Sequence, residues 1–165
     1  MTSFVSHSLP ETEQIAHGWL MQLSQTYEYT QGAVVVGLRG HLGAGKTAFT
    51  KSVAHILGIQ EEVTSPTFIL MKKYEIQSIE HRAESRDTSQ DELKIPWKYL
   101  VHIDAYRLED KNALAVLEWD KLISNKNNLI LIEWPEQVGI THFEPQCELS
   151  FSVEEHTTSR QINVQ

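Results

Sequence analysis

Several features that would tie a protein to a compartment or a chemistry are missing from this chain of 165 residues. Its single cysteine, Cys147, excludes an internal disulfide, which suits a reducing cytoplasm. No apolar run approaches the length of a membrane span, and the N-terminus lacks the basic and then apolar layout of a signal peptide, so we expect a soluble protein. The histidines show no H-x-x-x-H spacing, and we therefore assign no transition-metal site.

Positive charge is also scarce. The chain has 14 Lys and Arg against 22 Asp and Glu, which gives a net charge of −8 and a pI of about 5.4. Because neutralising a nucleic acid requires clustered Lys and Arg, we expect any involvement of RNA to be indirect. The length predicts one domain over residues 1–165, with a polar and charged surface insertion at 77–94 that we expect to be mobile.

What the sequence does contain is a glycine-rich stretch, GHLGAGKTAF, at residues 40–49. Four residues separate Gly40 from Gly45, and Lys46 and Thr47 follow directly, which is the spacing of a Walker A loop. The apolar, β-branched residues before it predict a buried strand, and the residues after it have the apolar spacing of a helix. This context favours a phosphate-binding loop over the alternative, an ordinary glycine turn.

The residue types of this loop suit phosphate chemistry. Glycines allow the backbone to curl so that successive N–H groups point at phosphate oxygens, close to the positive end of the helix dipole. Lys46 would reach the β- and γ-phosphates, and the Thr47 hydroxyl would ligate a magnesium ion.

The pattern along the whole chain predicts an α/β fold of the P-loop NTPase type: a mixed sheet flanked by helices, with antiparallel strands and a C-terminal hairpin. The predicted elements are a helix opened by a capping box at Ser8–Glu11, antiparallel strands at 68–74 and 97–104, a helix at 112–123, an interior strand at 129–132, and a hairpin of 146–153 with 160–164.

Two acidic residues come at the ends of predicted strands. Glu133 directly follows the interior strand, which is the position of a Walker B acid, and Asp104 ends the stretch YLVHID. An exposed strand-end carboxylate is the alternative for each. Beside a P-loop, we favour metal ligation by Glu133, directly or through water, and for Asp104 a role on the water shell of magnesium or in orienting the attacking water.

Three further features stay open between a site role and ordinary structure. Residues 64–67, TSPT, form either a switch that senses the γ-phosphate or a proline turn. Arg107 and Arg160 could complement phosphate or ribose charge, although surface arginines usually do neither. Trp134 is either an exposed contact or part of the core.

Four motifs, GHLGAGKTAF, TSPTFIL, HIDAYRL and LILIEWPE, occur in this order at intervals that resemble the TsaE family, formerly YjeE. That family is the small ATPase of bacterial tRNA threonylcarbamoyladenosine synthesis. The resemblance implies binding of ATP and Mg²⁺ and association with TsaD and TsaB, the subunits that install threonylcarbamoyl on the adenosine beside the anticodon. It further implies an ATPase that is weak alone and depends on partners, whose hydrolysis permits repeated turnover of that complex, with tRNA contacted only through the complex.

The resemblance also assigns residues by position. Nucleotide binding falls to Gly43, Ala44, Gly45, Lys46, Thr47 and Ala48, magnesium to Thr47, Glu133 and Asp104, and catalysis to Lys46, Asp104 and Glu133. Arg160 and either Glu11 or Thr12 are further nucleotide-binding candidates, although the capping box competes for Glu11.

The chain departs from the family pattern in several places. His41 stands where aspartate is usual, Ala48 where a second threonine is usual, and Glu118 near a common glycine, and the insertion is longer than the family's connection. Two other functions stay open: a small-molecule or nucleoside kinase, which would need an arginine-rich lid, and a nucleotide-gated binding module with negligible hydrolysis. A GTPase is disfavoured because residues 125–128, NKNN, lack the aspartate of N-K-x-D.

Overall fold

A computed structural model of the chain describes residues 2–27, 31–66, 70–77, 94–106, 117–138, 145–153 and 159–165. Its elements are β1 (Thr2–Ser6), α1 (Leu9–Tyr27), β2 (Val34–Arg39), α2 (Lys46–Ile56), β3 (Met71–Glu75), β4 (Tyr99–Asp104), α4 (Trp119–Ser124), β5 (Asn128–Glu133), the 3-10 helix η2 (Pro135–Val138), β6 (Cys147–Val153) and β7 (Arg160–Val164). Of the predicted insertion at 77–94, only Gln77 and Lys94 lie within the described residues.

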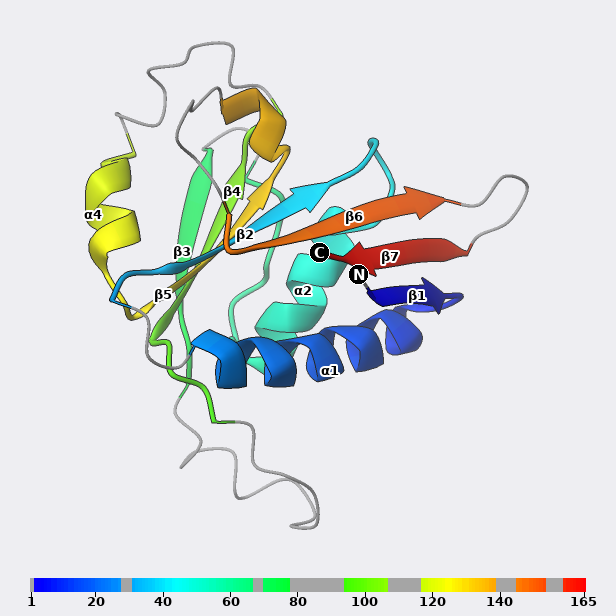
Figure 1. The fold of residues 1–165 in the computed structure, drawn as a ribbon, viewed down its shortest axis with the longest axis horizontal. Helices are drawn as coiled ribbons and strands as arrows, with labels where there is room; N and C mark the ends of the chain where they lie inside the picture. The colour runs from blue at the N-terminus through cyan, green and yellow to red at the C-terminus, as the bar shows by residue number, and fades with distance from the viewer. Residues whose placement is uncertain are drawn as a thin grey trace.

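The described strands form one mixed sheet in the order β1-β7-β6-β2-β5-β4-β3 (Figure 1). Strand β2 is parallel to both β5 and β6, and β4 is parallel to β5. The pairs β1–β7, β6–β7 and β3–β4 are antiparallel. The predicted mixed α/β sheet with a C-terminal hairpin is therefore confirmed, and so is the antiparallel pairing of the two strands on either side of the insertion.

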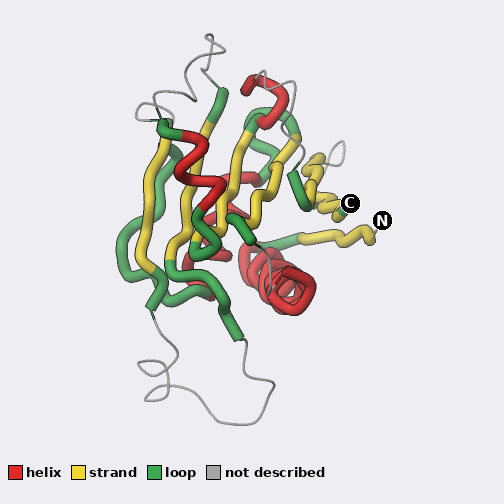
Figure 2. The backbone as a smooth tube through the Cα atoms, turned by 60° about the vertical axis from the view of Figure 1, so that its left-hand side comes forward, coloured by secondary structure: helices red, strands yellow, loops and turns green. Residues whose placement is uncertain are grey.

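Alternation along the strands divides the core between the two faces of the sheet. In β2, Val34, Val36 and Leu38 belong to the larger cluster, which includes residues of α1 and α2. Val35 points the other way, into a smaller cluster with the apolar residues of α4. A central strand that is apolar on both faces is typical of a sheet covered by helices on both sides. Figure 2 shows α1 end-on beside the strands.

Three predicted elements differ from the structure in their bounds, and a fourth element was not predicted. The strand predicted at 68–74 begins at Met71, and the strand predicted at 97–104 begins at Tyr99. The helix predicted at 112–123 is described only from residue 117, where α4 occupies Trp119–Ser124. Strand β1 had no sequence signal, because its mostly polar residues form a strand by pairing with β7, which also brings the two ends of the chain together (Figure 1). None of the described helices is long and apolar enough to cross a membrane.

Candidate nucleotide-binding site

The glycine loop connects β2 to α2 and depends on backbone angles that disfavour side chains. Gly40, Gly43 and Gly45 all have positive φ, at 140°, 78° and 109°. A Cβ added at Gly40 would lie 2.4 Å from the carbonyl oxygen of Phe151 in β6, whereas one added at Gly43 would meet nothing within 4 Å. Gly40 therefore permits close packing of the loop on the sheet, and Gly43 leaves one side of the loop open to a ligand.

Lys46, the first residue of α2, folds back over this loop. Its Nζ donates hydrogen bonds to the carbonyl oxygens of Gly40 at 2.6 Å and His41 at 2.9 Å, and lies 4.0 Å from the ring centroid of Trp134. Burial lowers the pKa of Lys46, and the carboxylate of Glu133 partly opposes this shift. The ammonium group is thus held by neutral acceptors, and a phosphate oxygen would be a stronger one.

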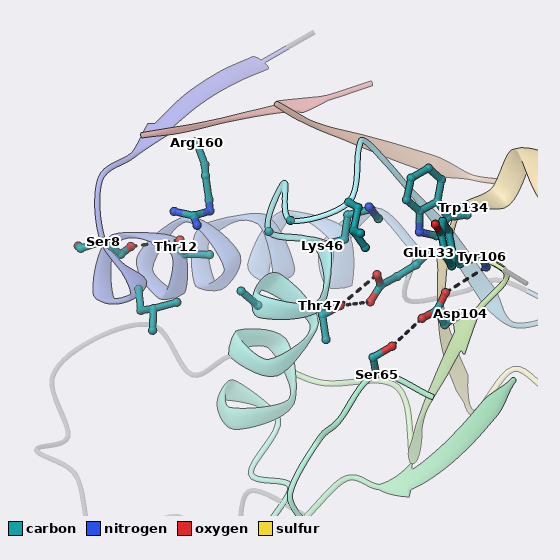
Figure 3. A pocket seen from close by; sticks show the side chains of 15 residues that line it. Ser8, Thr12, Lys46, Thr47, Ser65, Asp104, Tyr106, Glu133, Trp134 and Arg160 are labelled. Carbon is teal, nitrogen blue, oxygen red and sulfur yellow. Dashed lines mark hydrogen bonds between the residues drawn. The ribbon is translucent and has the colours of Figure 1, made fainter. Parts of the chain in front are cut away.

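Thr47 and Glu133 meet across the site from elements far apart in the chain. The Thr47 hydroxyl donates to the Glu133 carboxylate at 2.8 Å from Oε1 and 3.1 Å from Oε2 (Figure 3). Glu133 is the last residue of β5 and is 3% exposed. Because β2 and β5 are parallel, β2, which leads into the glycine loop, and β5, which ends at Glu133, have their carboxyl ends at the same edge of the sheet.

Asp104 lies beside Glu133, since β4 and β5 pair with these two residues in register. Ser65 donates a hydrogen bond to Asp104 Oδ2 at 2.6 Å, and the Tyr106 backbone N–H donates to Oδ1 at 3.0 Å. Each oxygen of the carboxylate is thereby oriented by a hydrogen bond. Ser65 belongs to the segment 64–67, for which a switch and a proline turn were both open, and its hydroxyl contacts a strand-end acid.

Trp134, for which an exposed contact and core packing were both open, is half-buried. It lines the cavity, packs against the smaller core cluster, and lies with its ring centroid 5.1 Å from that of Tyr106. Its φ of 59° is unusual for a residue with a side chain, and its N–H donates to the Leu38 carbonyl at 3.1 Å. The left-handed turn at Trp134 is therefore tied to β2 directly beside Glu133.

These side chains line a cavity of about 830 Å³. The described lining residues are Ser8, Leu9, Thr12, Leu42, Gly43, Gly45, Lys46, Thr47, Ala48, Ser65, Asp104, Tyr106, Glu133, Trp134 and Arg160. Ser8, Thr12 and Arg160 lie at one end, Glu133, Asp104 and Trp134 at the other, and Lys46 and Thr47 between them (Figure 3). A cavity of this size suits a molecule as large as a nucleotide.

Most of the residues assigned from the sequence come together here. Ala44 is buried and Glu11 is not in the lining, whereas Thr12, the alternative to Glu11, is. In the capping box the Ser8 Oγ accepts the Glu11 N–H at 3.3 Å, as expected. The Glu11 carboxylate was expected to accept the Ser8 N–H, and it accepts the His7 N–H instead, at 2.8 Å. Arg107 lies outside the described residues.

Sequence reasoning did not single out the lining residues Leu9, Leu42 and Tyr106, nor His102, which contacts the site from within the sheet. His102 is fully buried in β4, and its Nε2 lies 2.9 Å from Glu133 Oε1. The signal was present, because residues two apart in a strand share a face, and His102 precedes Asp104 by two.

The side chains present fit a magnesium nucleotide. Thr47, Glu133 and Asp104 offer only oxygen donors, which Mg²⁺ prefers. Among the residues that the structure describes, no group of three or more His, Cys, Asp and Glu could hold a metal by itself. A magnesium ion here would take its remaining ligands from phosphate and water, as it commonly does.

The mixed sheet, the glycine loop before α2 and the acids at the ends of β4 and β5 define an α/β fold like that of P-loop NTPases. The profile of the family described as "Threonylcarbamoyl adenosine biosynthesis protein TsaE" matches residues 6–162. The chain belongs to this family, whose members act in tRNA threonylcarbamoyladenosine biosynthesis.

Individual proteins agree with this assignment. The chain is 29% identical to "tRNA threonylcarbamoyladenosine biosynthesis protein TsaE" of Haemophilus influenzae, over 82% of this chain and 72% of the relative. It is 37% identical to the protein of that name from Treponema pallidum, over 66% of this chain and 64% of the relative, which is just under two thirds of that relative's length. The crystal structure of Bacillus subtilis YdiB shares the fold with a TM-score of 0.59 at 23% identity, covering 98% of this chain and 82% of that one.

Proposed function

We propose that this protein binds ATP with Mg²⁺ and hydrolyses it as an accessory subunit of the tRNA threonylcarbamoyladenosine machinery, in the cytoplasm. The observation that carries the proposal is the meeting of Thr47 and Glu133, at 2.8 Å, at the mouth of the glycine loop. A hydroxyl that follows the loop lysine, placed against a strand-end carboxylate, is the pair that holds magnesium in P-loop NTPases.

The cavity suggests how the nucleotide would lie. Its phosphates would occupy the end formed by the loop N–H groups, Lys46 and Thr47, where the dipole of α2 favours negative charge. The ribose and base would extend toward Thr12 and Arg160, which line the opposite end.

Each side chain at the phosphate end would have a separate task. Lys46 would exchange the carbonyls of Gly40 and His41 for phosphate oxygens, and Thr47 and Glu133 would hold the metal. Magnesium, when bound, neutralises charge that develops on the phosphates. Asp104, oriented through both of its oxygens by Ser65 and Tyr106, would accept a hydrogen bond from the attacking water.

Family membership supports partners in the same pathway, and we propose these to be homologues of TsaD and TsaB, with tRNA contacted only through them. Hydrolysis would then allow the complex to turn over repeatedly rather than perform the transfer itself. The net charge of −8 agrees with a subunit that has no broad RNA surface of its own.

Titration of ATP with and without magnesium tests the site. Lys46→Ala should weaken ATP binding by a few kcal/mol, the scale of a lost charge-assisted contact. Glu133→Gln should still bind ATP, with little help from magnesium, and should lower phosphate release by roughly a hundredfold or more. Lys51→Ala and Glu62→Gln, which make the same changes at exposed positions outside the cavity, should behave as wild type.

Phosphate release measured alone and with the TsaB–TsaD complex tests the role. Stimulation by the complex is the expected result. ATP binding without turnover in either condition would instead indicate a nucleotide-gated binding module, and a phosphorylated product from a nucleoside or metabolite panel would indicate a kinase. Full magnesium dependence and normal turnover in Glu133→Gln would make Asp104 the leading metal ligand.

A further inference from the structure

We propose that His102 is a positioning residue of the nucleotide site, holding the carboxylate of Glu133 in the orientation that receives the metal. The inference rests on the proposed function, because it concerns how that site is prepared. It assigns a task to a side chain that lies beneath the cavity and is not among its described lining residues.

The sheet places His102 directly under the strand-end acids. Asp104 pairs in register with Glu133, and His102 pairs with Leu131 on the same face of the sheet. The His102 ring therefore lies one step inward from the edge and points at the carboxylate from below, with Nε2 at 2.9 Å from Oε1. It is 0% exposed, so water does not compete for this hydrogen bond.

The direction of this hydrogen bond follows from its surroundings. A carboxylate accepts, so Nε2 carries the hydrogen and donates. His102 Nδ1 is also buried and has no hydrogen-bond partner among the described residues. A hydrogen on Nδ1 would be a buried donor without an acceptor, which is the more costly arrangement, and we assign the tautomer with Nε2–H.

The described hydrogen bonds of Glu133 come from Thr47, which is a proposed metal ligand, and from His102, which is not. Oε1 accepts from Thr47 at 2.8 Å and from His102 at 2.9 Å, whereas Oε2 accepts only the longer Thr47 contact at 3.1 Å. Thr47 is itself a proposed metal ligand, so its hydroxyl serves two groups. The Nε2 of His102 donates to Glu133 and to no other described residue. Because this bond goes to Oε1, Oε2 accepts fewer described hydrogen bonds and is the oxygen more open to a metal.

A purely structural role accounts poorly for this side chain. Four strand neighbours share the face of His102: Leu100 and Leu131 are fully buried and apolar, whereas Lys72 and Asp104 are polar. An apolar residue at position 102 would fill the same space without burying an unpartnered ring nitrogen. What the imidazole adds over leucine is the hydrogen bond to Glu133.

Three variants separate positioning from packing. His102→Leu keeps an apolar side chain of similar size and removes the donor. His102→Gln can place an amide N–H near the position of Nε2, whereas His102→Asn places its amide nearer to Nδ1 and too far from Glu133. Ile103→Val, on the opposite face of β4, is the control for a small loss of packing in the same strand.

The readout is the ratio of ATP affinities with and without magnesium, measured by calorimetry. We expect His102→Leu and His102→Asn to lose roughly ten- to a hundredfold of the magnesium enhancement, the usual effect of removing a group that orients a metal ligand, with metal-free affinity unchanged. His102→Gln and Ile103→Val should keep the wild-type ratio. A wild-type ratio in the leucine and asparagine variants, or an equal loss in all three His102 variants, would overturn the proposal.

A measurement on the wild-type protein tests the proposal even where a variant fails to fold. Long-range ¹H–¹⁵N correlation spectra of the histidine rings should show His102 with a hydrogen on Nε2, and an Nε2 without a hydrogen would overturn the proposal. The two proposals fail separately. Absence of magnesium-dependent ATP binding in the wild type would reject the proposed function, whereas normal binding with a wild-type ratio in His102→Leu would reject the role of His102 alone.

Discussion

Alanine substitutions at Gly40 and Gly43 should separate the structural glycine of the loop from the glycine that faces the ligand. Both residues have positive φ, so both variants strain the backbone. They differ in what the new methyl group meets. At Gly40 it would lie 2.4 Å from a backbone oxygen of β6, and at Gly43 it would have free space.

The expected magnitudes follow from these contacts. Placing alanine at Gly43, with φ of 78°, costs about 1–2 kcal/mol of left-handed strain. At Gly40, with φ of 140°, the strain is about 1–3 kcal/mol, and forcing the loop away from Phe151 adds about 1–3 kcal/mol. For a chain of 165 residues each kcal/mol lowers the melting temperature by about 2–4 °C.

Urea unfolding and ATP calorimetry on both variants supply the test. Gly40→Ala should be the less stable protein, and Gly43→Ala, at a residue that lines the cavity, should lose more ATP affinity than stability. The reasoning is refuted by the opposite order of stabilities, or by a Gly40→Ala variant as stable as the wild type.

Three further predictions concern other parts of the fold. Glu118 has φ of 51°, which favours glycine, so Glu118→Gly should raise the free energy of unfolding by up to about 1 kcal/mol. The control Lys121→Ala, which removes only the exposed ion-pair partner of Glu118, should change stability little, and a less stable glycine variant would contradict the prediction. Burial raises the pKa of the Cys147 thiol, so a thiol reagent at pH 8 should label the native protein slowly and the urea-unfolded protein fast, and equal rates would count against it. The Ile76 N–H donates to the Lys98 carbonyl at 2.9 Å, so the segments on either side of residues 78–94 lie close enough for a short bridge. Replacing residues 78–94 with a short glycine-containing bridge should leave ATP affinity and melting temperature nearly unchanged, and a large fall in melting temperature would contradict this.

Much of this fold could be predicted because its signals are local. The two-sided apolar pattern of β2 and β5 requires only the alternation of side chains along a strand, and it marks both as interior. The glycine loop requires only that certain positions tolerate positive φ, and the structure has that at Gly40, Gly43 and Gly45. The rule that parallel strands end at one edge then predicted that an acid after β5 would face the loop.

Local signals were insufficient where a residue had two possible partners. Glu11 was a candidate both for the nucleotide and for the helix cap, and its carboxylate accepts the His7 N–H. Strand β1 has little apolar alternation, and its place at the sheet edge depends on the pairing of Thr2 with Val164. The partner of β1 lies at the other end of the chain, and the local sequence does not specify it.

Sequence alone thus determined which residue types could bind phosphate and magnesium, because loop conformation and strand alternation are set within a few residues. The tertiary structure decided which of them meet. Thr47 and Glu133 are 86 residues apart, and His102 and Glu133 are 31 apart. Their hydrogen bonds exist because β2, β5 and β4 lie side by side in that order, and strand order is the outcome of burying the whole apolar surface at once rather than of any short stretch of the chain.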